Sequence, residues 1–351
     1  MLHPILLALL AAPVAQDSHL DSVVVAQAQR QELVGLAWAV VREGQPLHQG
    51  SYGLANREQE QPVNASTLFR WASISKPLTA VVAMQLVQAG RLDLEKDVRE
   101  YVPEFPKKPF PINSRQLLCH QGGIVHYTNG PVIKTDVEYK VEHPFEDVVV
   151  ALDTFKESPL VNEPGTAYAY TTRGYMLLGA VVQRAGKESY WKQVQNRIAK
   201  PLGMKSLRPD YPWTKTHERA RGYRRALGVI VPSTDTDVSW KLAGGGFTST
   251  VGDLARFAEG MLADKLVSTK TRAGMWTRQP LPKGKTSSYG LGFGVGQSHG
   301  QRMISHTGSQ EATRTLMHLY PDTGLALVLM SNSEYANLRA IATAAEDLLF
   351  E

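Results

Sequence analysis

The order of strand-like and helix-like segments along the chain constrains the fold more than any other feature. Short apolar runs typical of strands lie near both ends of the chain, at 34–41, 48–54, 289–295, 301–306, 313–320 and 325–331. Turn-forming sequences separate them, among them Arg42–Pro46 and the PDTG segment at 321–324, and such spacing is a hairpin signal. We therefore predict one antiparallel sheet built from both ends of the chain, with the central residues inserted between its strands.

The middle of the chain has the pattern of helices joined by loops rich in proline and glycine. The predicted helices are 18–33, 78–90 with a start near 73, 145–155, 174–185, 190–202, 249–262 and 334–350. Residues 73–246 form the mainly helical part, and residues 17–72 and 247–351 form the sheet part. These segments predict an α+β fold in which one catalytic domain covers residues 17–351.

The first sixteen residues have the pattern of a signal peptide. An apolar run from Ile5 to Ala12 is too short to cross a membrane and is followed by small residues. The leader lacks Lys and Arg, and Pro13 is poorly placed for cleavage after Ala15. The alternative is a short apolar segment packed on the domain. We expect export, to a secreted or periplasmic location, with no integral membrane segment after the signal is removed.

Composition excludes several classes of protein. The net charge is +5, but Lys and Arg are scattered and not gathered into a basic stripe, so nucleic-acid binding is not expected. One cysteine, Cys119, excludes a disulfide framework. His120 and His126 have no other ligand at suitable spacing apart from Cys119, so no metal or cofactor is expected. A thiol nucleophile at Cys119 is also less expected than a buried structural cysteine, because adjacent residues rarely face each other.

Two serines and a lysine lie within four positions in the segment Ser73-Ile-Ser-Lys76. Pro77 fits the first turn of a helix, where its missing N–H needs no partner. On a helix, residues three apart share a face and residues two apart do not. Ser73 and Lys76 can therefore meet, whereas Ser75 points elsewhere. A serine hydroxyl needs a neighbouring base to become a nucleophile, and lysine can be that base if burial or nearby positive charge lowers its pKa.

Two other segments match simple nucleophile patterns. Ser189 and Lys192 repeat the Ser-x-x-Lys spacing inside a charged segment, which favours a solvated helix face. Ser298 lies in a Gly-x-Ser-x-Gly match, but that motif requires a helix directly after the serine. The residues that follow, QRMISH, are a strand candidate, so we expect Ser298 in a hairpin loop.

Several motifs in a fixed order resemble the serine β-lactamase and D-alanyl-D-alanine carboxypeptidase superfamily, in its class C and esterase-like branch. The matches are SISK at 73–76, Pro164-Gly165, Tyr170 with Gly174-Tyr175, Leu178-Gly179, PLGM at 201–204, GGGFTST at 244–250 with Asp253-Leu254, YGLG at 289–292 and HTG at 306–308. They run through most of the chain from about residue 20. SISK, the segment 119–127 and Tyr170-Thr-Thr172 resemble most the mitochondrial serine β-lactamase-like subgroup and its bacterial relatives.

The resemblance implies a β-lactamase/transpeptidase-like fold and a role for each matching residue. Ser73 would be acylated by the substrate, and Lys76 and Tyr170 would act as general base and general acid. The backbone N–H groups of Ser73 and Ser309 would form the oxyanion hole. The opposite wall would be lined by His306, Thr307 and Gly308. The expected enzyme is a serine hydrolase with a small-molecule or peptide substrate.

Two departures from the family pattern limit the expected substrate. Thr172 stands where the second motif usually has asparagine, and His306 stands where dedicated β-lactamases have a lysine that attracts the carboxylate of the drug. Hydrolysis of esters or small amides is therefore favoured over efficient β-lactam hydrolysis. A Tyr-x-Asn match at Tyr335-Ala-Asn337 follows the third motif and is interpreted as a coincidence.

A second function is consistent with the same resemblance. The mitochondrial relative assembles into filaments, so a catalytically weak binding or filament-forming assembly protein is the alternative, and a homo-oligomer is possible. Substrate choice would depend on loops around the cleft, expected at 103–111, 127–143 and 210–236.

Overall fold

The computed structural model describes residues 5–43 and 47–351, with the backbone alone for 5–16. The predicted signal peptide at 1–16 therefore lies partly outside the described residues, as does the tip of the predicted turn at 42–46. Within the described part of the chain, no helix is long and apolar enough to cross a membrane.

The main sheet is antiparallel and joins both ends of the chain, as predicted. Its seven strands follow the order β11-β12-β13-β14-β1-β2-β3, with bounds β1 Gly35–Val41, β2 His48–Asn56, β3 Gln61–Pro62, β11 Gly294–Ser298, β12 Gln301–Gln310, β13 Thr313–Tyr320 and β14 Leu325–Ser331. β1 pairs with β14 from Leu36 opposite Ser331 to Val41 opposite Ala326. Both strands are buried along their whole length, as expected for the centre of a sheet covered on both faces.

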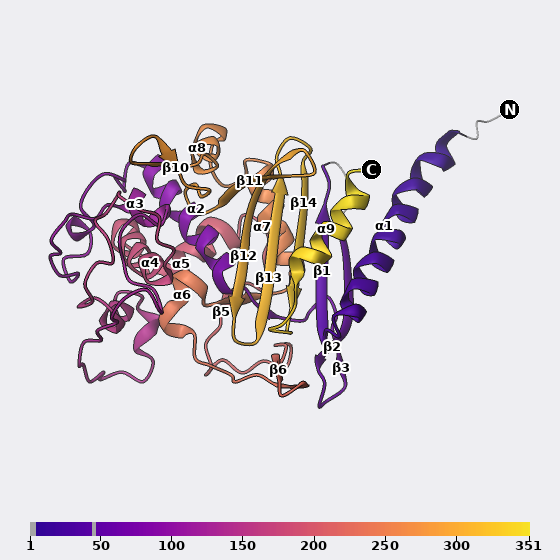
Figure 1. Cartoon of the computed structure of the whole chain (residues 1–351), viewed down its shortest axis with the longest axis horizontal. Coiled ribbons are helices and arrows are strands. Elements are labelled where there is room, and N and C mark those ends of the chain that lie inside the picture. The colour runs from indigo at the N-terminus through magenta and orange to yellow at the C-terminus, as the bar shows by residue number, and fades with distance from the viewer. Residues whose placement is uncertain (1–4, 44–46) are drawn as a thin grey trace.

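The helices lie on the two faces of this sheet and in the inserted part (Figure 1). Their bounds are α1 Ile5–Arg30, α2 Ser75–Gln88, α3 Ser114–Leu118, α4 Thr172–Gly186, α5 Tyr190–Val194, α6 Leu242–Gly245, α7 Val251–Leu262, α8 Thr269–Met275 and α9 Leu338–Leu349. Single turns of 3₁₀ helix occur at η1 Ala72–Ile74, η2 Val98–Glu100, η3 Pro144–Glu146, η4 Val150–Thr154 and η6 Ser239–Lys241, and a π-helical turn, η5 Gln195–Ala199, continues α5.

Short strands lie outside the main sheet. They are β4 Phe69–Arg70, β8 Phe247–Ser249 and β5 Arg208–Pro209 in one sheet, the hairpin β6 Tyr223–Ala226 with β7 Val229–Pro232, and the pair β9 Pro280–Leu281 with β10 Lys285–Thr286. Because β4 directly precedes η1 and pairs with β8, this small sheet ties the segment before Ser73 to the segment after α6.

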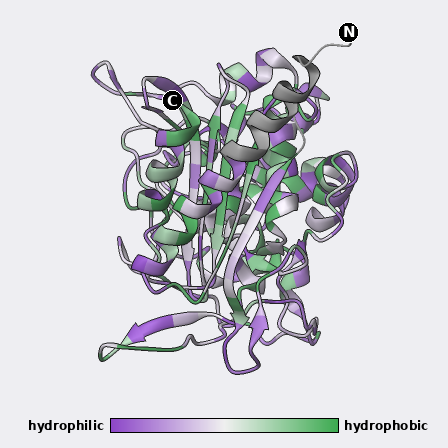
Figure 2. Cartoon of the chain, turned by 90° about the vertical axis from the view of Figure 1, so that its right-hand side faces the viewer, coloured by the Kyte–Doolittle hydropathy of each residue, from purple (hydrophilic) through white to green (hydrophobic). Residues whose placement is uncertain are grey.

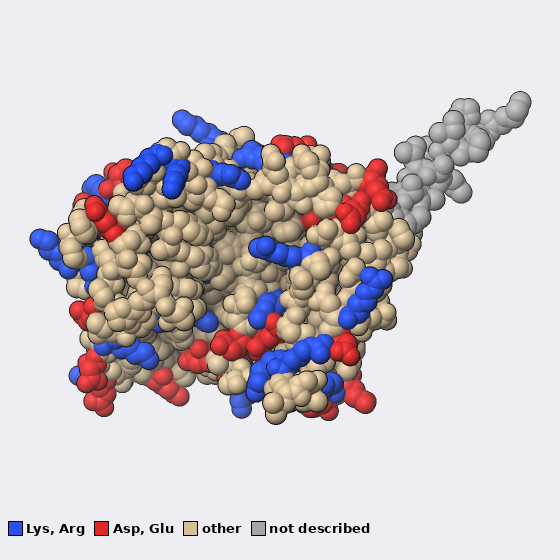
Figure 3. All heavy atoms as spheres, viewed as in Figure 1, with Lys and Arg blue, Asp and Glu red and all other residues tan. Residues whose placement is uncertain are grey.

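Two apolar clusters cover the two faces of the main sheet. On one face α1 and α9 pack on the strands, with Leu20, Val24 and Ala28 fully buried at successive turns of α1. Figure 2 looks onto this side of the molecule, where both termini lie. The larger cluster lies on the other face and continues into α2, α4 and α7. On the face that Figure 3 shows, acidic and basic side chains are interspersed.

Some predicted elements differ in the structure. The strand expected at 289–295 is at 294–298, because the chain passes close to its neighbours at Gly290 and Gly292. A Cβ on Gly290 would lie 2.1 Å from the Met275 carbonyl oxygen, and Gly292 has a φ of +93°. The helix expected at 145–155 is two 3₁₀ turns, the hairpin β6–β7 was not predicted, and α9 begins only at Leu338.

Candidate active site

Ser73 lies at the junction between β4 and the buried helix α2. It belongs to the 3₁₀ turn η1, and α2 begins two residues later, at Ser75, whereas the sequence predicted a helix from about Ser73. Ala72 has a φ of +48°, a conformation that costs non-glycine residues free energy and is often found at functional sites. Ser75 is buried, and its hydroxyl accepts a hydrogen bond of 3.4 Å from the Phe247 N–H. Ser73 is partly exposed, so of the two serines it is the one that faces the cleft.

Lys76 is fully buried, and its amine contacts three oxygen atoms. Nζ lies 3.0 Å from Ser73 Oγ, 3.2 Å from Thr172 Oγ1 and 2.8 Å from the Gly244 carbonyl oxygen. None of the ion pairs among the described residues includes it. Burial, and then the charge of Lys241, hold the pKa of Lys76 well below its usual range. A neutral amine has two N–H donors for Thr172 and Gly244 and one lone pair for the Ser73 hydroxyl, so the contacts match its bonding capacity.

Tyr170 lines the same cavity as Ser73. The Lys76 amine lies 4.9 Å from its ring centre. Burial raises the pKa of Tyr170 above its ordinary value, although the Ser73 hydroxyl acts in the opposite direction. A phenol in this environment keeps its proton at neutral pH and can pass it to a neighbouring atom.

The segment Cys119–Tyr127 holds the N-terminus of α4, where Thr172 lies. The Thr171 N–H donates to His120 Nδ1 and the Thr172 N–H donates to His126 Nδ1, each over 3.2 Å. Both rings must be unprotonated at Nδ1 to accept these bonds. Burial is the main cause that lowers the pKa of both rings, and that of His126 falls to about 4. The two histidines therefore act as helix caps that position Thr172.

The third motif lies on β12, which runs past η1. Thr307 and Ser309 line the cleft, but His306 and Gly308 do not, although both were predicted to lie on its wall. His306 points inward. Its side chain is buried, with Nδ1 donating to the Thr307 carbonyl oxygen and Nε2 accepting from the Tyr289 hydroxyl, both over 2.8 Å. Burial and the nearby Lys76 lower the pKa of His306 to about 3. Gly308 faces η1, where a Cβ would lie 2.4 Å from the Trp71 carbonyl oxygen.

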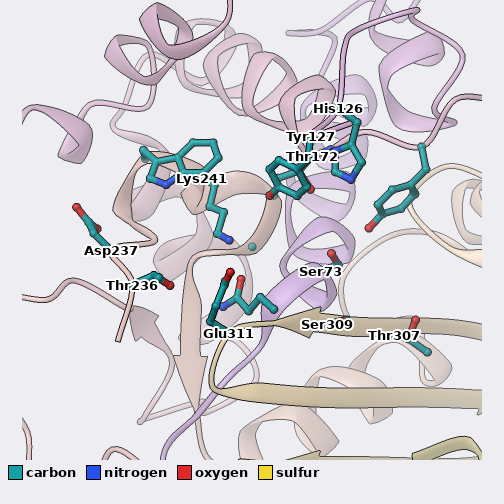
Figure 4. Close-up of a pocket in the computed structure, with 15 residues that line it drawn as sticks. Ser73, His126, Tyr127, Thr172, Thr236, Asp237, Lys241, Thr307, Ser309 and Glu311 are labelled. Carbon is teal, nitrogen blue, oxygen red and sulfur yellow. The ribbon is translucent and has the colours of Figure 1, made fainter. Parts of the chain in front are cut away.

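A cavity of about 660 Å³ lies beside Ser73 (Figure 4). Its lining is Ser73, His126, Tyr127, Tyr170, Thr172, Thr236, Asp237, Trp240, Lys241, Gly244, Gly245, Thr307, Ser309, Gln310 and Glu311. Two of the loops expected to shape the cleft contribute Tyr127 and Thr236, while residues 105–111 of the third expected loop line a separate cavity. Sequence reasoning missed Lys241 and Gln310. Lys241 lies three residues before the matched GGGF segment, and this position is the signal that could have indicated its place in the cleft.

The rival candidates lie elsewhere. Ser189 precedes α5, and Lys192 pairs with Glu188 on the surface. Burial raises the pKa of the Cys119 thiol to about 12, which leaves it unreactive as a nucleophile. Asn337 caps α9. Among the described residues no group of three or more His, Cys, Asp and Glu side chains could hold a metal ion.

Ser298 ends β11 in a hairpin, as expected from its flanking residues. Its hydroxyl lies 2.9 Å from His299 Nδ1, and His299 Nε2 lies 2.9 Å from Asp347. The residues are thus arranged as serine, histidine and aspartate, an arrangement that the sequence did not indicate. A strand follows Ser298 in place of the helix that the Gly-x-Ser-x-Gly motif requires.

Comparison with known proteins gives a consistent result. The family model described as Beta-lactamase matches residues 20–350. The human mitochondrial serine β-lactamase-like protein is 27% identical, over 88% of this chain and 75% of the relative. Penicillin-binding protein 4* of Bacillus subtilis is 29% identical, over 88% of this chain and 70% of the relative. The octameric penicillin-binding protein homologue from Pyrococcus abyssi superposes with a TM-score of 0.79 at 25% identity, covering 95% of this chain and 77% of the homologue.

Proposed function

The chain belongs to the β-lactamase family of serine hydrolases, and we propose that it hydrolyses esters or small peptide amides through an acyl-enzyme on Ser73. The observation that carries this proposal is the set of contacts of the Lys76 amine. A buried lysine with a lowered pKa, 3.0 Å from Ser73 Oγ, is suited to act as a general base.

In the proposed reaction, the Ser73 O–H bond breaks and its proton moves to the neutral Lys76 amine. The Ser73 oxygen forms a bond to the substrate carbonyl carbon, and the carbonyl oxygen becomes an oxyanion held by the backbone N–H groups of Ser73 and Ser309. Collapse of this intermediate breaks the bond to the leaving group, which takes a proton from the Tyr170 hydroxyl. The proton on Lys76 then replaces the one that Tyr170 gave. A water molecule later releases the acid and restores Ser73.

The polar groups of the cleft support an ester or a small amide over a β-lactam. His306 holds the position of the family's carboxylate-binding lysine, but it is buried and its pKa is about 3, so it carries no charge at neutral pH. The Thr172 hydroxyl oxygen accepts a hydrogen bond from the Lys76 amine, and a threonine has one donor fewer than the asparagine usual at this position. We therefore propose weak or absent β-lactamase activity.

The test is a comparison of initial rates on a short-chain 4-nitrophenyl ester, a chromogenic cephalosporin and a small peptide 4-nitroanilide. The wild type is run beside Ser73→Ala and two controls, Ser75→Ala and Ser298→Ala. We expect Ser73→Ala to lose turnover while both controls keep it, with the ester fastest and the cephalosporin slowest. Equal rates in Ser73→Ala and the wild type would refute the acyl-enzyme on Ser73. Loss of turnover in Ser298→Ala would instead indicate that Ser298, in the hairpin after β11, is the nucleophile.

A homo-oligomer is a second proposal, supported by the octameric state of the homologue from Pyrococcus abyssi. Its test is the mass of the purified protein by light scattering. An oligomer that persists in Ser73→Ala, in a protein without measurable turnover, would favour the assembly function over hydrolysis. A monomer would refute this second proposal.

We also propose export from the cytoplasm, on the strength of the apolar run Ile5–Ala12. Mass spectrometry of the protein made in a bacterial host would show removal of about the first sixteen residues. An intact N-terminus on protein recovered from the cytoplasm would refute export.

A further inference from the structure

Three polar groups without a hydrogen-bond partner line the same cavity as Ser73. They are the Lys241 amine and two atoms that are buried without a partner, the side-chain amide nitrogen of Gln310 and the Thr236 hydroxyl oxygen. Buried polar groups in proteins are nearly always hydrogen-bonded, and exceptions call for an explanation. An incoming group with several acceptor oxygens would satisfy all three at once.

Lys241 is the strongest of the three observations. Lys241 is 7% exposed. No hydrogen bond or ion pair joins its amine to another described residue. The amine instead lies 5.6 Å from the ring centre of Trp240 and 6.0 Å from that of Tyr127. Glu311, which lines the same cavity, acts on the charge of Lys241 but forms no ion pair with it. The buried amine therefore keeps its N–H donors for an incoming anion.

Gln310 and Thr236 add neutral donors beside this cation. The Gln310 amide nitrogen and the Thr236 hydroxyl oxygen are each buried without a partner among the described residues. Gln310 follows Ser309, the predicted oxyanion residue, on β12, and Thr236 enters from the loop before η6. The three groups therefore converge from separate parts of the chain.

This group of donors lies on the side of Ser73 opposite to Tyr170. Figure 4 shows Ser73 between Thr307 on one side and Lys241 with Glu311 on the other. Ring contacts place Tyr170 at the Thr307 side, because Tyr170 packs on His120, His120 on Tyr289, and Tyr289 on His306. Tyr170 is the proposed donor to the leaving group, so the Lys241 side accommodates the acyl part of the substrate.

The charges around the site favour an anion with a single negative charge over a dianion. Glu311 and Asp237 line the same cavity, and two carboxylates would repel a dianion such as a phosphate monoester. We propose that Lys241, Gln310 and Thr236 form a subsite for a carboxylate carried by the acyl part of the substrate. The inference rests on the proposed hydrolase function and narrows its substrate to half-esters or half-amides of dicarboxylic acids.

The test uses pairs of activated esters that differ in one charge. Mono-4-nitrophenyl esters of succinic, glutaric and adipic acid carry the carboxylate, and their methyl esters are the neutral twins. For each pair the measured quantity is the ratio of kcat/KM for the anionic ester to that for its twin. We expect the wild type to prefer the anionic ester at one chain length at least, because only a matching length reaches Lys241.

Lys241→Met should lower this ratio by roughly tenfold or more, the size of a lost hydrogen bond to a charged group. Gln310→Leu should lower it less, since a neutral donor is lost. Lys192→Met is the matched control, because Lys192 is 63% exposed outside the cavity, and its loss changes the net charge and one surface ion pair with Glu188. The ratio, unlike the rate, is independent of any effect of Lys241 on Lys76.

The subsite would be overturned if the ratio were unchanged in Lys241→Met. It would also be overturned if the wild type preferred the anionic ester in none of the pairs. If the wild type hydrolyses neither ester of any pair, the proposed function is wrong. A binding measurement then tests the subsite by itself. Calorimetry with monomethyl glutarate would be run on Ser73→Ala and on the same variant that also carries Lys241→Met. We expect binding in the first protein and none in the second. Absence of such binding would overturn the subsite as well.

Discussion

At the scale of single residues, the state of Lys76 decides whether Ser73 can react. Arginine cannot give up its proton in a protein, so Lys76→Arg places a fixed positive charge where the neutral amine would act as the base. We expect Lys76→Arg and Lys76→Met to lower kcat by roughly 10²- to 10⁴-fold, the usual contribution of general base catalysis. Thermal melts would verify that both variants fold. More than a tenth of wild-type activity in Lys76→Arg would show that Lys76 is not the base.

The pH dependence of kcat/KM offers a second test at this scale. Burial is the first cause of the lowered pKa of Lys76, and the charge of Lys241 is the second. Lys76 acts in its neutral form, so the rate should rise with pH through its pKa. Removal of the neighbouring charge in Lys241→Met raises that pKa, and the acidic limb of the profile should move to higher pH. A limb that stays in place or moves to lower pH would contradict this account.

Single residues also differ in how far the sequence predicted their place. Ser73 and Lys76 could be predicted because their contact depends on helix geometry alone. The sequence placed His306 on the cleft wall, but its ring turns inward to Tyr289, because a strand presents alternate residues to opposite faces and the wall face of β12 carries Thr307 and Ser309. Lys241 was missed since its position depends on how η6 folds against the loop that carries Tyr127.

At the scale of elements, the approach of β12 to η1 shapes the cleft. A Cβ on Gly308 would lie 2.4 Å from the Trp71 carbonyl oxygen and 2.9 Å from Ala72 Cβ. Gly308→Ala should therefore push Ser309 away from Ser73, with about 1–3 kcal/mol lost from the free energy of unfolding and a marked fall in kcat.

Urea unfolding and ester hydrolysis would measure both effects of Gly308→Ala. Gly296→Ala in β11 is the control, because its added Cβ would come no closer than 4.0 Å to its nearest neighbour. Full activity in Gly308→Ala would mean that β12 can move away from η1 without harm to the oxyanion hole.

Elements with their own local signals could be predicted well from the sequence. The helix expected at 174–185 is α4, and Thr250 caps α7 one residue from the expected start. The run at 289–295 was misjudged because YGLG looks extended, whereas the packing of its glycines against distant backbone decides its path. Hairpin β6–β7 has two strands of four residues each, too short for a clear alternating pattern.

At the scale of the whole molecule, histidines whose pKa is lowered in the folded state make the stability of the fold depend on pH. The pKa of His306 is about 3 and that of His126 about 4, both below the ordinary 6.5. The unfolded chain therefore binds more protons between pH 6.5 and 3, and stability falls as pH falls through this window. His306→Gln keeps a donor and an acceptor but does not titrate. The free energy of unfolding of this variant should therefore fall less steeply than that of the wild type as the pH is lowered.

Urea unfolding at several pH values from 7 to 4 would measure this dependence. One histidine contributes at most about 1.4 kcal/mol per pH unit, and the slopes of the wild type and His306→Gln should differ by up to that amount. Equal slopes would mean that His306 binds its proton in the folded state as readily as in the unfolded one.

The two faces of the sheet should also respond separately to mutation. Leu20 on α1 is fully buried against the face opposite to the larger cluster. Leu20→Ala should lower the free energy of unfolding by about 2–5 kcal/mol and leave kcat at 25 °C unchanged, because Ser73 lies across the sheet. Gln29→Ala, at an exposed position of the same helix, is the control. Unchanged stability in Leu20→Ala would mean that α1 is not part of the folded domain, and the domain would then begin well after the predicted cleavage site.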